Sequence, residues 1–302
     1  MLALLFAASV TLHGTWSAVV SADRVQLNMV REDSNWGQSF PRSDFTFSDA
    51  DVNSAAERPV AFALKREAGT IDFTGSFQNG EGVGRFNFTP NPEFAATLRA
   101  LGVSSEDPLD DEKLFRVAMH GITTAFIRDM QSLGYRENLE TYIRFRIHGV
   151  TPEFVRDMNA LGYKPDAEDL VRFRIHGVSP QFVHDLRDLG YTSMASEDLV
   201  RFRIHGVSPE FVRDLKGLGY TSLSSEDLVR FRIHGVSPEF VRELRDLGYA
   251  SLSSEDLVRF RIHGVTPDFI RELATAGYHN IPPEKLVQMK IRGLDAVSLR
   301  NQ

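Results

Sequence analysis

The stretch LVRFRIHGVSPEFVRELRDLGY, residues 228–249, decides the fold of this chain. Close copies recur along most of the sequence, each with the marker His-Gly-Val-Ser/Thr-Pro, which begins at His148, His176, His205, His234 and His263. The marker returns every 28 or 29 residues, with a weaker form at His120 and a decayed form at Arg292. A period this regular is typical of a repeat array, in which each unit buries its apolar face only by stacking on its neighbours.

The first half of one repeat encodes a short helix. Ser208 is a good N-cap, and Pro209 follows at the first helical position, where its missing N–H costs nothing. Gly219 is predicted to end this helix in a left-handed conformation. Between these signals, one apolar stripe at helical spacing is formed by Phe211, Val212, Leu215 and Leu218.

The second half of the repeat encodes another helix. Ser224 and Asp227 form a capping-box-like pair at its start, and His234 with Gly235 ends it. Its apolar contacts are predicted to come from Leu228, Phe231 and Ile233. Each helix has only about ten residues, too few to be stable alone in water, so stability must come from stacking.

Residues 15–90 are predicted to form a separate β domain. Alternating apolar residues share one face of each segment, as in RVQLNMVR at 24–31 and GRFNFT at 84–89. Period-two patterns between turn residues are typical of antiparallel strands with one buried face. We expect a small meander or partial barrel of five or six strands, with Trp16 and Trp36 in or beside its core, and a polar surface loop at 48–57.

The joint between the two regions is short. Asn91 is a helix cap and Pro92 a first helical residue, so the array is predicted to start directly after the last strand. The expected class is therefore α+β: an antiparallel β domain at 15–90, then an α-solenoid of about seven helical-hairpin repeats at 91–302. A signal-like segment at 1–14 precedes both.

The N-terminal stretch MLALLFAASV, residues 1–10, is apolar but far too short to span a bilayer as a helix. It resembles the core of a secretory signal, which favours a periplasmic or extracellular location. A mis-assigned start, or a fragment of a longer membrane-anchored chain, is the alternative, and a membrane-proximal location would then follow.

Composition excludes several classes of function. A net charge of −7 with 25% charged residues argues against nucleic acid as the main partner, because phosphate binding needs concentrated positive charge. The absence of cysteine excludes disulfides, thiolate metal sites and a cysteine nucleophile. Zinc-protease, serine-hydrolase, phosphate-loop and dinucleotide motifs are also missing. We expect no enzyme and no cofactor; an enzyme with an unrecognised site is the minor alternative.

One histidine per repeat suggests a ladder of ligands for a metal or haem. Neighbouring copies should lie roughly 10 Å apart, as packed helices do, whereas zinc needs ligands converging on one point about 2 Å away. The favoured interpretation is that each histidine interacts with the terminal carbonyls of its own helix. No metal site is expected.

Arginines repeat beside the histidines. Glu226 precedes Arg230 by four residues, which predicts an ion pair within one helix and a solvated, salt-bridged face. The alternative is a ladder that binds an acidic partner surface or an anionic polymer. Candidate partner-binding residues are Arg144, Arg172, Arg201, Arg230 and Arg259 with His148, His176, His205, His234 and His263.

Several motifs occur together: Trp36-Gly37-x-Ser39-Phe40-Pro41, the glycine-rich stretches at 66–75 and 82–94, and the His-Gly-Val-Ser/Thr-Pro repeats. From about Gly14 onward this set resembles the envelope-exposed C-terminal region of some bacterial membrane metallopeptidases of the β-lactam-sensor type, and their stand-alone relatives. The peptidase part and its zinc-binding helix have no counterpart in these motifs. The resemblance implies an extracytoplasmic binding or sensing module; it implies neither protease activity nor a particular ligand.

Two functions follow as expectations. The first is a non-catalytic protein–protein interaction or sensing module of the bacterial envelope, binding an unknown protein through the solenoid surface. The second is a self-assembling structural protein, an oligomer or filament built from repeat surfaces and β-edge pairing.

Overall fold

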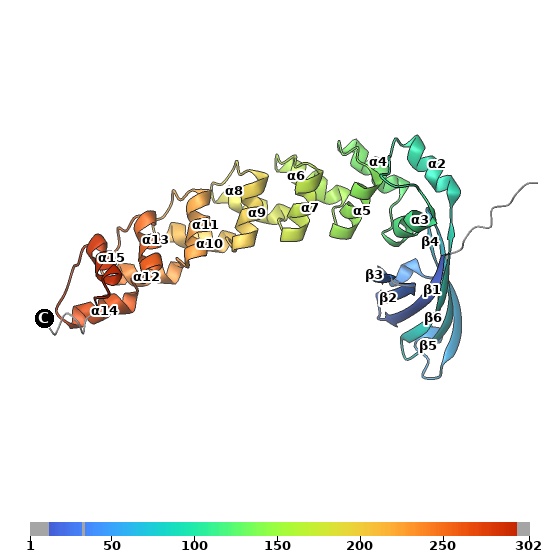
Figure 1. Ribbon diagram of the computed structural model, residues 1–302, viewed down its shortest axis with the longest axis horizontal. Helices are drawn as coiled ribbons and strands as arrows, with labels where there is room; N and C mark the ends of the chain where they lie inside the picture. The colour runs from blue at the N-terminus through green and yellow to red at the C-terminus, as the bar shows by residue number, and fades with distance from the viewer. Residues whose placement is uncertain (1–11, 32–33, 295–302) are drawn as a thin grey trace, which may run out of the picture. The chain divides into compact units, whose positions relative to one another are not determined.

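The computed structural model describes residues 12–31 and 34–294, and the chain divides into two compact units, 1–156 and 157–302. An antiparallel sheet is followed by a repeated pattern of helices, so the predicted α+β class is confirmed (Figure 1). The predicted boundary after residue 90 marks the change from strand to helix, but the first two helix pairs share a compact unit with the sheet. Within the described ranges no helix is long and apolar enough to cross a membrane.

The sheet has six strands: β1 (Leu12–Val20), β2 (Arg24–Arg31), β3 (Ser34–Pro41), β4 (Arg58–Arg66), β5 (Gly69–Gln78) and β6 (Glu81–Pro90). Their order is β3-β2-β1-β6-β5-β4, and every pairing is antiparallel. Two three-strand meanders are therefore joined where β1 pairs with β6, a pairing the strand pattern did not specify. Since β1 begins at Leu12, the predicted boundary after Gly14 falls inside a strand, and the rest of the signal-like segment lies outside the described residues.

The core of the sheet is aromatic, and Trp16 lies at its centre with 3% of its surface exposed. Its ring packs edge-on against Phe62, 5.3 Å between centroids, and its Nε1 donates to the carbonyls of Thr74 at 3.2 Å and Arg85 at 3.1 Å. The indole crosses β6 at Gly84, where a Cβ would lie only 2.8 Å from Nε1. Glycine at this position is what lets the ring lie against the strands.

The segment predicted as a surface loop contains a short helix, α1 (Asp49–Val52), which follows the 3-10 turn η1 (Arg42–Asp44). Ser48 caps α1 by accepting from the amide of Asp51, and Val52 is fully buried. The prediction was wrong here because Val52 is the one large apolar residue among the ten residues 48–57, which gives no periodic signal.

The sheet passes into the array without a linker. Strand β6 ends at Pro90, Asn91 accepts from the amide of Glu93, and α2 begins at Pro92, as predicted. The next helix, α3, packs on the sheet through Phe115, whose ring lies 5.3 Å from those of Trp36 and Phe88. Trp36 therefore lies beside the core, as expected.

Lys113 of α3 is the one buried charged residue that the described ranges contain, with 6% of its surface exposed. Its Nζ lies 2.7 Å from Glu140 and 3.1 Å from Asp107. The contact with Glu140 joins the first helix pair to the second, because Glu140 belongs to α5, whereas Asp107 lies between α2 and α3 of the first pair.

Seven helix pairs follow the sheet among residues 92–291. Their helices are α2 (Pro92–Ala100), α3 (Asp111–Met119), α4 (Thr124–Ser132), α5 (Leu139–His148), α6 (Pro152–Ala160), α7 (Ala167–His176), α8 (Pro180–Asp188), α9 (Ser196–His205), α10 (Pro209–Gly217), α11 (Ser225–His234), α12 (Pro238–Asp246), α13 (Ser254–His263), α14 (Pro267–Thr275) and α15 (Pro283–Ile291). In the second unit the second helices of each pair, α7, α9, α11, α13 and α15, pack on one another in sequence, and the first helices α8 to α14 do the same (Figure 1).

The end signals of the helices are confirmed. Ser208 accepts from the amide of Phe211, with Pro209 at the first helical position. Ser224 and Asp227 form a capping box, and α11 ends at His234 before Gly235, whose φ is 71°. These local signals set where both helices of the repeat begin and end, while their stability still depends on stacking.

Candidate interaction surface

The second helices bury one side and leave the other to solvent. In α11, Leu228, Val229 and Phe231 are buried, while Ile233 is 55% exposed. The prediction that Ile233 makes apolar contacts in the repeat was therefore wrong. Ile233 lies five residues after Leu228, and at about 100° per residue this turns it away from the buried stripe.

The same exposed isoleucine recurs in every second helix from α5 onward. The exposed fractions are 49% for Ile147, 54% for Ile175, Ile204 and Ile262, 55% for Ile233 and 62% for Ile291. Because α7, α9, α11, α13 and α15 pack in sequence, their isoleucines follow one another along the surface. We call these five residues of the second unit the isoleucine row: Ile175, Ile204, Ile233, Ile262 and Ile291.

A row of ion pairs accompanies the isoleucines. In α7, α9, α11 and α13 the arginine three residues before the isoleucine binds a glutamate of the next repeat: Arg172 to Glu197 at 2.6 Å, Arg201 to Glu226 and Arg230 to Glu255 at 2.9 Å each, and Arg259 to Glu284 at 3.6 Å. The predicted pairing of Glu226 with Arg230 inside one helix was wrong, because the carboxylate bonds to Arg201 instead. That hydrogen bond raises the pKa of Arg201.

These arginines are thus part of the stacking between repeats as well as of the surface. The side chains of Arg201 and Arg230 remain 34% and 35% exposed, so a partner can still reach them. Arg144, the remaining arginine of the predicted ladder, is exposed on α5 in the first unit.

The predicted histidines end their helices, as expected. His148, His176, His205 and His234 are half-buried and His263 is exposed. Their backbones carry a contact that the sequence did not reveal: Arg203 Nε donates to the carbonyl of His176 at 3.2 Å, and Arg232 and Arg261 do the same to His205 and His234. Over residues 12–31 and 34–294, no three His, Asp or Glu side chains gather closely enough to hold a metal ion.

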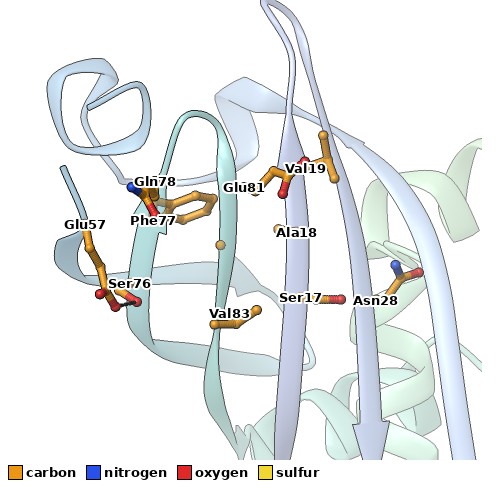
Figure 2. Close-up of a pocket in the computed structure, with 11 residues that line it drawn as sticks. Ser17, Ala18, Val19, Asn28, Glu57, Ser76, Phe77, Gln78, Glu81 and Val83 are labelled. Atoms are coloured by element: carbon orange, nitrogen blue, oxygen red, sulfur yellow. Dashed lines mark hydrogen bonds between the residues drawn. The ribbon is translucent and has the colours of Figure 1, made fainter. Parts of the chain in front are cut away.

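A hollow of about 480 Å³ lies on the open face of the sheet, over β1, β5 and β6 (Figure 2). Ser76 donates to Glu57 at 2.6 Å on one side of it, the exposed Val83 lies next to Ser76 on β6, and the exposed Val19 lies on β1. The acidic residues that line it are Glu57 and Glu81.

A second hollow, of about 420 Å³, lies in the first unit at the end of α3. Its cations bind protein groups: Arg66 pairs with Asp44 at 2.5 Å, and Arg146 Nε donates to the carbonyl of His120 at 3.1 Å. Burial lowers the pKa of His120, aided by Arg116 and Arg146, so its ring is neutral at pH 7. Asp44 offsets the charge of Arg66, whereas the neutral carbonyl of His120 leaves the positive charge of Arg146 in place.

Comparison of the chain with protein-family models, with curated proteins and with solved structures finds no match. The isoleucine row is the surface feature that sequence reasoning missed. A helical projection of residues 225–234 would have found it, since Ile233 falls on the same side as Glu226 and Arg230.

Proposed function

We propose that this chain is a non-catalytic interaction protein that binds protein through the exposed face of its second helices. One observation supports this most strongly: the isoleucine row leaves about half of each large aliphatic side chain in water at five successive repeats. Single exposed apolar residues are ordinary, but a continuous line of them is typical of a binding surface.

Duplication of one repeat does not by itself explain why an exposed isoleucine occurs in every repeat of the isoleucine row. Helix α15 reads PEKLVQMKI, whereas α13 reads SEDLVRFRIH, so most of its positions have changed. Ile291 is nevertheless retained and is 62% exposed. Helix α5, LETYIRFRIH, differs from α13 in its first half, and it also has an exposed isoleucine, Ile147. An exposed position without a role tolerates polar residues, which are better solvated.

The proposal includes an extracytoplasmic location in the bacterial envelope. It is supported by the signal-like stretch at 1–10 and by the resemblance to sensor-type envelope regions. A fusion of residues 1–40 to a reporter enzyme that folds only after export tests this location. Reporter activity is expected, and loss of activity is expected when Leu4 and Leu5 are both changed to Arg. An inactive wild-type fusion would contradict the proposed location.

Binding is tested by site-specific photocrosslinking in cells. A photoreactive amino acid replaces Ile204 or Ile233 on the proposed face, and Arg213, which is exposed on the first helix α10, serves as the matched control. We expect discrete protein adducts from the two isoleucine positions and none from the control. Absence of adducts at both isoleucines would contradict the proposed function.

A further inference from the structure

We propose that the partner of the isoleucine row is the same row of a second copy of this chain, related by a two-fold axis that runs through Ile233. The inference rests on the proposed function and specifies its partner. The two chains would pack face to face with their repeats running in opposite directions. Ile233, the third of five positions, would then meet its own counterpart.

The spacing of the row favours this partner. Stacked helices lie about 8–10 Å apart, so the isoleucines recur at about that interval. Residues on one face of a β-strand recur every two residues, or about 6.6 Å, and do not match the row. In an α-helix laid along the row, every seventh residue recurs at about 10.5 Å, so the helix would contact each isoleucine through only one residue. A second copy of the chain has the same spacing, so each of its isoleucines can lie opposite an isoleucine of the first copy.

The charges of the face are self-complementary. Along it, arginines and glutamates alternate and pair, from Arg172–Glu197 to Arg259–Glu284. The face is therefore close to neutral and does not repel its own copy. Because the signs alternate, a reversed copy can place a glutamate opposite each arginine, as a two-fold interface requires.

The area of the face is sufficient for a stable dimer. Each second helix of about ten residues is about 15 Å long, and five of them stacked about 10 Å apart cover about 750 Å². A specific interface of standard size buries about 800 Å² on each partner. The isoleucines would form the apolar centre of this interface and the ion pairs its polar rim.

The first test is the mass of the purified full chain in solution, measured by sedimentation equilibrium. We expect twice the 34.0 kDa of one chain. The variant Ile204→Lys/Ile233→Lys should weaken the dimer by at least tenfold, because the lysines at position 233 of both copies would face each other and the lysine at position 204 would face the apolar Ile262. Lysine is well tolerated in the last helical turn, so circular dichroism and thermal unfolding should show an intact fold.

The matched control is Val19→Lys/Val83→Lys, which changes two equally exposed residues on the sheet. It should keep the dimer. A monomeric wild-type chain at tens of micromolar, or a dimer that the isoleucine variant leaves unchanged, would overturn the inference.

The second test fixes the geometry, since the chain contains no cysteine and single thiols can be introduced at will. Under mild oxidation Ile233→Cys should form a disulfide-linked dimer. Ile175→Cys alone should not, but it should crosslink when mixed with Ile291→Cys, because the two-fold exchanges the ends of the row. Self-linking of Ile175→Cys would overturn the antiparallel arrangement.

The outcomes separate the two proposals. Photocrosslinks from Ile204 to a different protein, together with a monomeric purified chain, would leave the proposed function standing and overturn the second copy as partner. Absence of adducts in cells and of a dimer in solution would overturn both.

Discussion

Arg203 Nε lies 3.2 Å from the carbonyl oxygen of His176, the last residue of the preceding second helix. The same guanidinium lies over the ring of Phe182, 5.1 Å from its centroid. One side chain therefore satisfies a free carbonyl at a helix end, places positive charge at the negative end of the helix dipole and covers an aromatic ring. Arg232 and Arg261 repeat these contacts, which join each repeat to the one before it.

The first prediction concerns this arginine. Arg232→Ala should lower the free energy of unfolding by about 1–2 kcal/mol, because a hydrogen bond and a cation–π contact are both lost. Arg232→Lys should cost less, since the last repeat already places Lys290 over Phe269 at 4.6 Å. Urea unfolding followed by circular dichroism measures both variants. Arg213→Ala on the exposed face of α10 is the control, and an equal loss there would contradict the assignment.

The second prediction separates two reasons for glycine at helix ends. Gly235 has a φ of 71°, and a Cβ there would also lie 2.8 Å from Arg261 Nη2. Gly248 has a φ of 93°, but a Cβ there would meet nothing within 4 Å, and Gly217 is an ordinary helical glycine with open space around it. In thermal unfolding, Gly248→Ala should cost about 1–2 kcal/mol from backbone strain. Gly235→Ala should cost more, and Gly217→Ala should be neutral or stabilise by up to about 1 kcal/mol. Equal costs at all three positions would refute the explanation.

The third prediction tests the ion-pair row. A double-mutant cycle on Arg201 and Glu226, with alanine at each, should give a coupling energy of about 0.3–1 kcal/mol, as expected for a partly exposed pair. The same cycle on Glu226 and Arg230 should give a coupling near zero, because Arg230 binds Glu255. Raising the salt concentration to about 1 M should reduce the first coupling. A larger coupling for Glu226 with Arg230 would restore the pairing within one helix.

The fourth prediction is a loss of stability at alkaline pH. The hydroxyls of Tyr191, Tyr220 and Tyr249 donate to carbonyls of the following repeat at 2.7–2.9 Å, and burial raises the pKa of all three phenols. The unfolded chain, with tyrosine pKa near 10, releases these protons first. Stability from this source is therefore fully present below about pH 10 and falls as the pH rises further.

The triple variant Tyr191→Phe/Tyr220→Phe/Tyr249→Phe tests this loss of stability at alkaline pH. At pH 8 it should be less stable by about 1 kcal/mol per lost hydrogen bond, but its stability should fall less steeply above pH 10. Tyr278→Phe is the control, because Tyr278 is 42% exposed at the equivalent place in the last repeat. Parallel pH profiles for the wild type and the triple variant would show that these phenols do not carry the effect.

Much of the fold could be predicted because its signals are local. Ser208 with Pro209 starts a helix and Gly235 ends one through contacts within a few residues. Alternation in the strands likewise predicted the buried face of the sheet. The pairing of β1 with β6 could not be predicted in this way, because it joins residues about 70 positions apart and depends on how the two meanders meet.

The candidate site was predicted only in part. The sequence pointed to the arginines, but it paired Glu226 with Arg230 instead of Arg201. Sequence spacing alone does not show whether a carboxylate bonds within its own helix or to a neighbouring repeat. The histidine side chains were emphasised, whereas their carbonyls make the contacts that the structure shows. Ile233 was assigned to the core because it is apolar.

The sequence by itself determined the repeat period, the two capped helices of each repeat and the strand pattern, since all of these depend on spacing and on short-range hydrogen bonds. Only the tertiary structure decided which apolar residues are buried. Stacking covers Leu228 and Phe231 and leaves Ile233 in water, because burial depends on the neighbour that each side of a helix meets. For the same reason, the pairing of Arg201 with Glu226 exists only once two repeats lie side by side.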